Sequence, residues 1–293
     1  MIKQILAISS IVLFSSAISA AEIIPYGSFN YKWSNDENSS GKSYSKLEDN
    51  GSSIGVEVID LGAEGDTITG FAKLEVGVDT DDSGSDTFDS KLAYVGLDSD
   101  MGALSVGRQS HPFADNIGGK TSIFNVYGGS SDWNYGSRSS NSMKFSTTQS
   151  GLTLDTIGIV DGSSTNTNAF DEFEVTISTK LFGSDVSVGY ADDVNSDISY
   201  WGVAGSTDLG PLTMSSSYTI YDAATDKYGL EATASYSIFS VGYGDKEGTG
   251  VAYTAGVSHD LNESVSVYAE GEMKDLDSGS DTTSWSIGSK FTF

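Results

Sequence analysis

Apolar and polar residues alternate along many short segments of this chain, and this pattern constrains the fold more than any other feature. In residues 67–78, one parity carries Ile68, Leu74 and Val76, while the other parity is mostly polar or charged. Residues 264–274 show the same arrangement. Successive side chains of a β-strand point to opposite faces of a sheet, so a two-residue period predicts strands. We find no convincing helical period, and the chain is therefore expected to be all-β.

The alternation predicts sixteen strands. Their approximate ranges are 23–33, 52–60, 67–79, 90–98, 102–108, 140–147, 152–160, 171–180, 185–192, 198–207, 212–221, 227–237, 239–244, 249–259, 264–274 and 282–293. Long acidic connections, such as 34–51 and 109–139, alternate with mostly short ones, such as 61–66 and 148–151. Long loops at one end and tight turns at the other are typical of an even-stranded antiparallel barrel. No change of composition divides residues 22–293, so we expect a single domain.

The two faces of the predicted strands differ in a way that favours a transmembrane barrel. The polar face carries ionised groups of both signs, and the apolar face contains many Ala, Gly and Thr residues with aromatic residues near the strand ends. A sheet with lipid outside and water inside has this distribution. A soluble β-sandwich or β-solenoid would bury its apolar face in a core of larger side chains, and it is the alternative fold.

The N-terminal segment has the features of a secretory signal peptide. Lys3 is followed by an apolar run over 5–14 and then by small residues up to Ala20 and Ala21. A membrane anchor needs about 20 apolar residues, and this run is shorter. We expect residues 1–21 to direct export, with cleavage after Ala20 or Ala21.

Composition excludes several classes of function. The chain has 41 Asp+Glu against 15 Lys+Arg, whereas nucleic-acid binding requires clustered basic residues. The absence of Cys rules out disulfides, thiolate metal sites and cysteine nucleophiles. His111 and His259 are the two histidines, and no Gly-x-Ser-x-Gly motif accompanies them. We expect neither an enzyme nor a nucleic-acid-binding protein, and no resident cofactor.

The last predicted strand ends on an aromatic residue. Trp285, Ile287, Phe291 and Phe293 share one parity, and Phe293 is the last residue of the sequence. This ending resembles the C-terminal signal of outer-membrane barrels, which the barrel-insertion machinery reads. The resemblance implies that Phe291 and Phe293 act as an assembly signal. It also implies a location in the outer membrane, in contact with lipid and lipopolysaccharide.

A second resemblance is carried by residues 91–147. Lys91–Leu97 and Gly102–Gln109 precede the longest predicted connection, and Arg138–Phe145 follows it. A strand pair that ends in Gly-Arg, a long third loop and an Arg that opens the next strand are similar to the general diffusion porins of Gram-negative bacteria. The segment that begins at Ala21, Ala-Glu-Ile-Ile-Pro-Tyr-Gly-Ser, is also similar to the start of those proteins.

This resemblance implies a homotrimer of sixteen-stranded barrels that passes small hydrophilic solutes and ions without a catalytic step. The third loop would fold into the lumen and narrow the pore. Carried over by position, Arg108 and Arg138 are the wall cations of the constriction, and Asp115 and Asp132 are their acidic partners. The family often has a further Arg in the second strand, where this chain has Ser52-Ser-Ile-Gly-Val.

Alternation predicts different orientations for the two arginines. Arg138 shares parity with Lys144, which lies on the polar face, so it is expected to face the lumen. Arg108 shares parity with the apolar Val106, so simple alternation points it outward. A β-bulge at Gly107 would turn Arg108 inward.

Charged residues at the expected lumen positions predict the ion preference of such a pore. These positions are Glu57, Glu75, Glu174, Glu231, Glu270 and Glu272, against Lys73, Lys144, Lys180 and the two arginines. Focusing of the electric field by this wall and by the acidic loops favours cations. We therefore expect a cation-preferring pore.

An acidic motif occurs twice in the predicted loops. Asp82-Ser-Gly-Ser-Asp86 recurs as Asp277-Ser-Gly-Ser-Asp281, and the first copy is preceded by Asp79 and Asp81. Clustered carboxylates on Gly-containing turns suit Ca²⁺, but the full ligand spacing of a calcium loop is absent. Solvated loops are the simpler interpretation, and a structural calcium ion is the alternative.

Two other functions remain open on the sequence. A substrate-specific channel, for example for sugars, would line its pore with aromatic side chains. The longest connection contains such residues, namely Phe113, Phe124, Tyr127, Trp133 and Tyr135. A secreted calcium-dependent adhesin is the alternative that is not a channel.

Overall fold

The computed structural model describes residues 21–293 apart from 63–64, 82–86, 130–135, 161, 163–168, 195 and 223–225. Residues 1–20 of the predicted signal peptide therefore lie outside the described residues. Within the described part of the chain, no helix is both long and apolar enough to cross a membrane.

Strands make up almost all of the described secondary structure. They are β1 (Glu22–Glu37), β2 (Ser43–Asp49), β3 (Ser53–Leu61), β4 (Ile68–Val78), β5 (Phe88–Ser99), β6 (Ala103–Ser110), β7 (Arg138–Gln149), β8 (Leu152–Ile159), β9 (Glu172–Leu181), β10 (Ser184–Asp193), β11 (Ile198–Leu209), β12 (Leu212–Asp222), β13 (Lys227–Tyr236), β14 (Phe239–Lys246), β15 (Gly250–Asn262), β16 (Val265–Leu276) and β17 (Thr282–Thr292). A short helix, α2 (Pro112–Asn116), and a 3-10 helix, η2 (Gly118–Lys120), follow β6.

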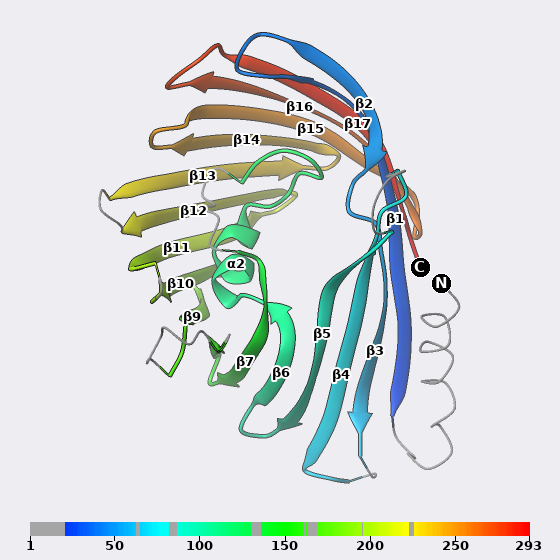
Figure 1. The fold of residues 1–293 in the computed structure, drawn as a ribbon, viewed down its shortest axis with the longest axis vertical. Helices are drawn as coiled ribbons and strands as arrows, with labels where there is room; N and C mark the ends of the chain where they lie inside the picture. The colour runs from blue at the N-terminus through cyan, green and yellow to red at the C-terminus, as the bar shows by residue number, and fades with distance from the viewer. Residues whose placement is uncertain are drawn as a thin grey trace.

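Antiparallel pairing joins the strands into one closed barrel (Figure 1). Each strand from β3 to β16 pairs with the next one along the chain. β1 closes the ring, because residues 28–35 pair with β17 while residues 22–28 pair with β3. β2 pairs with residues 31–37 of β1, so β2 and β3 share one position in the ring. The seventeen strands thus fill sixteen positions, which confirms the predicted barrel.

Alternation along the strands separates an apolar outer face from a polar inner face. On β16, Tyr268, Glu270 and Glu272 are buried inside the barrel, whereas Val267 and Met273 are exposed. Exposed large apolar side chains recur around the outside of the barrel. Lipid solvates such side chains in a transmembrane barrel, so their exposure carries no penalty.

The segment 34–51, expected to be a loop, is instead largely a hairpin. β1 continues to Glu37, and the chain returns as β2. The hairpin is tied to β17 and to the connection that precedes it: Ser280 N donates to Ser39 O at 3.0 Å, and Thr283 N of β17 donates to Glu37 Oε2 at 3.0 Å. Most of β2 is polar and exposed, so no apolar face marked it as a strand.

The C-terminal residue takes part in the closure of the barrel. Phe293 N donates to Gly27 O at 3.1 Å, and Gly27 N donates to Phe293 O at 3.0 Å. The Phe293 ring stacks on Phe29 of β1, with 6.3 Å between the ring centroids. The role of Phe291 and Phe293 as an assembly signal stays a prediction.

We expect Phe293→Ala to lower the amount of folded protein recovered from outer membranes, because it removes the ring that stacks on Phe29 where the barrel closes. Heat-modifiable migration in SDS gels measures the folded fraction. Phe182→Ala is the matched control, since Phe182 is a fully exposed aromatic residue at the β9–β10 turn. Equal recovery of the two variants would exclude a special role for Phe293.

Candidate functional site

Residues 111–129, here called the inner segment, lie inside the barrel. They follow β6 and include α2 and η2. Figure 1 shows α2 within the ring of strands. Hydrogen bonds link the inner segment to wall residues on strands from β8 to β16, so this part of the chain covers one side of the lumen.

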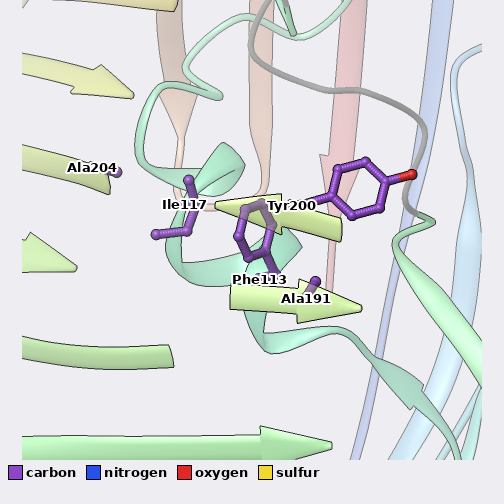
Figure 2. Close-up of a cluster of buried hydrophobic side chains, with 5 residues drawn as sticks. All are labelled: Phe113, Ile117, Ala191, Tyr200 and Ala204. Carbon is purple, nitrogen blue, oxygen red and sulfur yellow. The ribbon is translucent and has the colours of Figure 1, made fainter. Parts of the chain in front are cut away.

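The first turn of the inner segment packs into a small apolar cluster on the barrel wall. Phe113 and Ile117 are fully buried against Ala191 of β10 and against Tyr200 and Ala204 of β11 (Figure 2). Alanines at inward positions leave room for the two larger side chains. The apolar residues on the inner face of β10 and β11 are therefore the contact site of the inner segment.

Two wall glycines permit a still closer approach. A Cβ atom on Gly202 would lie 2.7 Å from Ile117 Cγ2 and 2.8 Å from Phe113 Cζ. A Cβ atom on Gly242 of β14 would lie 2.8 Å from Phe124 Cε2. Any larger residue at either position would push the inner segment away from the wall.

Glu174 of β9 holds the beginning of the inner segment. Its Oε1 lies 2.5 Å from His111 Nδ1, and its Oε2 accepts a hydrogen bond from Phe113 N at 3.0 Å. The other imidazole nitrogen, His111 Nε2, lies 2.7 Å from Ser139 Oγ of β7. His111 is fully buried.

Further wall groups hold the middle of the segment and its last residue. Glu231 of β13 accepts hydrogen bonds from Thr121 Oγ1 at 3.1 Å and from Gly129 N at 2.9 Å. Asn116 Nδ2 donates to Asp155 Oδ2 of β8 at 3.0 Å. These contacts fix the segment across the width of several strands.

β16 holds the end of the segment through two carboxylates. Glu270 accepts hydrogen bonds from Asn125 N at 2.7 Å, from Asn125 Nδ2 at 2.9 Å and from Val126 N at 3.0 Å. Glu272 accepts one from Gly128 N at 3.4 Å. Both glutamates face the lumen, as alternation predicts, but the inner segment covers them.

Glu174, Glu231, Glu270 and Glu272, here called the wall carboxylates, share one role. They are 2%, 4%, 6% and 5% exposed, and each accepts a backbone N–H of the inner segment. Some backbone donors of the segment bond within it, such as Ile117 N to Phe113 O, and the other N–H groups need acceptors elsewhere. Ionised acceptors make these bonds stronger than neutral ones.

The far end of the inner segment reaches β1. Tyr127 Oη donates to Asp36 Oδ1 at 3.5 Å, and Asn50 Nδ2, between β2 and β3, donates to Asn125 O at 3.0 Å. Burial raises the pKa of the Tyr127 phenol above its ordinary value, and the charge of Asp36 raises it further. The phenol therefore stays protonated and keeps its donor role.

The inner faces of β1 to β5, here called the open wall, carry lysines beside carboxylates. Lys32 Nζ lies 3.4 Å from Glu48, Lys73 Nζ lies 3.4 Å from Glu57, and Lys91 Nζ lies 3.9 Å from Glu75. Tyr26 connects two of these pairs: its Oη donates to Glu75 at 2.9 Å, and Lys73 Nζ lies 4.9 Å from its ring centroid. Lys73 and Glu75 thus lie together in the lumen.

Asp115, one of the predicted acidic groups of the constriction, lies beside a lysine. Lys144 Nζ of β7 is 3.8 Å from Asp115 Oδ2, and Ser110 Oγ donates to the same carboxylate at 2.6 Å. The cation next to Asp115 in the structure is therefore Lys144 rather than an arginine. Asp132 lies outside the described residues.

Arg108 points away from this cluster. Its neighbour Gln109 is buried and bonded to Ser105, so alternation places Arg108 on the outer face. The guanidinium donates to Ser90 O at 3.0 Å and to Ser140 Oγ at 3.3 Å. The irregularity expected near Gly107 exists, but the extra residue is on β7, so β6 keeps its alternation.

The same irregularity changes the orientation expected for Arg138. Ser140 and Asn141 of β7 stand against the single residue Arg108 of β6, and Asn141 has a φ of 56°. The extra residue reverses the parity on one side of the bulge. Ser139, not Arg138, therefore shares the inner face with Lys144. Arg138 is exposed at the start of β7. The role of both arginines at the constriction stays a prediction.

The acidic loop motif is only partly described. Asp82 and Asp86 lie outside the described residues. Asp79 Oδ1 accepts a bond from Asp81 N at 3.1 Å, and Asp281 Oδ1 accepts one from Leu276 N at 3.4 Å. Among the described residues, which include Asp277, no group of three or more acidic or histidine side chains is placed to hold a metal ion.

Comparison with known proteins decides the family. The family model for the Gram-negative porin matches residues 7–279. This chain belongs to the Gram-negative porins. The porin is therefore an outer-membrane β-barrel that forms a channel, as the resemblance in residues 91–147 implied. No curated protein sequence matches it.

Solved structures show the same fold. A loop-L8 deletion mutant of OmpT, an outer membrane protein of Vibrio cholerae, aligns with a TM-score of 0.75 at 18% identity, covering 94% of this porin and 100% of that chain. OmpF of Salmonella typhi aligns with a TM-score of 0.74 at 16% identity, covering 92% and 97%. A mutant of the Rh. blastica porin aligns with a TM-score of 0.67 at 18% identity, covering 93% and 100%.

Sequence reasoning identified the inward parity of the wall carboxylates but missed their role. Their partners are backbone N–H groups of a segment without a regular period, so no sequence pattern could reveal the pairing. Lys32 and Lys91 were missed as lumen residues. Lys91 lies where a register shift on β5 interrupts the alternation.

We expect Glu270→Ala to loosen the inner segment and to increase the single-channel conductance of the porin. The variant leaves two part-buried backbone donors and one side-chain donor without this acceptor, at a cost of up to about 1–3 kcal/mol each. Planar-bilayer recording measures the change. Glu263→Ala, which removes an exposed carboxylate at the β15–β16 turn, is the control and should conduct like the wild type.

We expect Gly202→Ala also to increase the single-channel conductance, in this case by changing only the packing of the inner segment. The added methyl group overlaps Ile117 and Phe113, and overpacking of this kind costs about 1–3 kcal/mol. Conductance and thermal unfolding would both report it. Gly271→Ala is the control, because its Cβ would meet only Ser284 O at 3.6 Å. Identical behaviour of the two variants would contradict the close approach seen at Gly202.

Proposed function

We propose that this porin lets small hydrophilic solutes and ions diffuse passively across the outer membrane, with a preference for cations. The observation that carries the proposal is the one-sided placement of the inner segment. It covers the wall from β8 to β16, so the permeation path runs between the segment and the open wall. Diffusion along a wetted, charged wall needs no catalytic group.

The charges along this path support the preference for cations. Each lysine of the open wall lies within 4 Å of a carboxylate, so nearby negative charge offsets its field. Asp36 adds negative charge near the far end of the inner segment, and the whole chain carries a formal charge of −26. A focused negative potential raises the local concentration of cations.

The aromatic residues of the inner segment give little support to a sugar-specific channel. Phe113 is fully buried against the wall, and Phe124 approaches Gly242. Tyr127 is bonded to Asp36. Rings that are packed against the wall, as those of Phe113 and Phe124 are, cannot stack against a passing sugar, and Trp133 and Tyr135 lie outside the described residues. General diffusion is therefore the better proposal.

A homotrimer is part of the proposal. A solved structure of OmpT of Vibrio cholerae in its trimer form aligns with this porin with a TM-score of 0.74 at 15% identity. Planar-bilayer recording of the refolded mature chain tests both parts at once. Stepwise, ohmic insertion in groups of three and a cation-signed reversal potential in a KCl gradient are expected. Folded, inserted protein that does not conduct would refute the proposal.

We expect Lys73→Gln and Lys91→Gln to increase the cation preference. A unit charge at about 4 Å in water is worth about 1 kcal/mol, so its removal from the path shifts the reversal potential toward the cation value. Lys180→Gln is the control. Lys180 has the inward parity of Glu174, as expected, but it pairs with Asp185 at the exposed β9–β10 turn and is not part of the open wall. Arg108→Gln tests the family-based assignment in the same assay. Unchanged potentials for both lysine variants would place the path elsewhere.

A further inference from the structure

Three side chains at the start of the inner segment form a chain of hydrogen-bonding groups whose order goes beyond what anchoring the segment requires. Glu174 Oε1 lies 2.5 Å from His111 Nδ1, and His111 Nε2 lies 2.7 Å from Ser139 Oγ. They come from β9, the inner segment and β7. The sequence offered no sign of this arrangement, because His111 is 28 positions from Ser139 and 63 positions from Glu174.

The order of the three groups is that of an activated nucleophile. A carboxylate at Nδ1 fixes the tautomer that carries its proton there, which leaves the Nε2 lone pair directed at the serine hydroxyl. Glu174 is further held by Phe113 N at 3.0 Å, so its position does not depend on the imidazole alone. A serine with a base in hydrogen-bond reach, and a base oriented by a third group, is the signature of nucleophilic chemistry.

Ser139 is also accessible to small molecules. It lines a cavity of about 220 Å³ together with Gly136, Ala191, Tyr200 and the acidic residues Glu172, Glu174, Asp192 and Asp193. His111, in contrast, is fully buried and is not among the residues that line the cavity. A molecule in the cavity therefore meets Ser139 rather than the imidazole.

We propose that Ser139 is a covalent modification site for small activated acyl compounds, such as aryl esters, that enter the pore. Ser139 Oγ attacks the carbonyl carbon, and its proton moves to His111 Nε2. The bond from the carbonyl carbon to the leaving oxygen then breaks, and His111 returns the proton to that oxygen. The products are acylated Ser139 and a free phenol, and Glu174 stabilises the transient imidazolium.

The cavity also predicts which acyl compounds react. Carboxylates line it, so neutral and cationic reagents are favoured over anionic ones. Its volume suits short acyl groups. The preference follows from charges around the serine and is independent of the ion preference of the whole pore.

The test uses the purified, membrane-inserted porin with 4-nitrophenyl acetate as the probe. Trypsin cleavage after Arg138 and Lys144 isolates residues 139–144, and fragmentation distinguishes Ser139 from Ser140 and Ser142. We expect a single acetyl group on Ser139. The anionic mono-4-nitrophenyl ester of succinic acid should label it more slowly.

Variants separate an activated serine from an ordinary exposed one. Ser139→Ala should abolish the label, whereas Ser140→Ala should retain it, because Ser140 is bonded to Arg108 instead. Glu174→Gln keeps an oxygen acceptor for Phe113 N and should slow labelling roughly tenfold or more. Heat-modifiable migration in SDS gels shows that each variant is folded. The proposal would be overturned if the folded porin were not labelled, if the label were spread evenly over the three serines, or if Glu174→Gln were labelled at the wild-type rate.

Discussion

The hydrogen bonds from the backbone of the inner segment to the wall carboxylates are the interaction on which the site depends. A barrel of sixteen strand positions encloses a wide lumen, and its backbone groups are satisfied by neighbouring strands. The inner segment has no such partners. Four buried glutamates supply them, and the segment therefore lies along the wall from β9 to β16 rather than across the centre.

Packing and charge act together in this arrangement. Phe113 and Ile117 occupy the space left by alanine and glycine residues on β10 and β11, which places the backbone donors within reach of the carboxylates. Burial of a carboxylate is costly unless hydrogen bonds compensate it, and here each wall carboxylate accepts one or more. The apolar cluster and the polar contacts thus stabilise the same position of the segment.

The sequence could predict the barrel because two-residue alternation is a local property that each strand displays by itself. It could not predict β2, which is mostly polar and exposed and has no apolar face. The sequence also could not predict the orientation of Arg138. A single extra residue at Ser140 and Asn141 reverses the parity, and only the left-handed tolerance of Asn hints at such a bulge. The roles of Glu174 and Glu231 depend on contacts between residues 61 to 102 positions apart, which no local pattern records.

The one-sided position of the inner segment divides the barrel into two parts with different evolutionary freedom. Residues from β9 to β16 that face inward must fit the segment, so most changes there would alter the shape of the lumen itself. On β1 to β5, Asp36 is bonded to the segment, but the lysine–carboxylate pairs of the open wall line the proposed permeation path. Exchanges of charge among them leave the scaffold intact, so a lineage can retune what its outer membrane admits through a few substitutions on these strands.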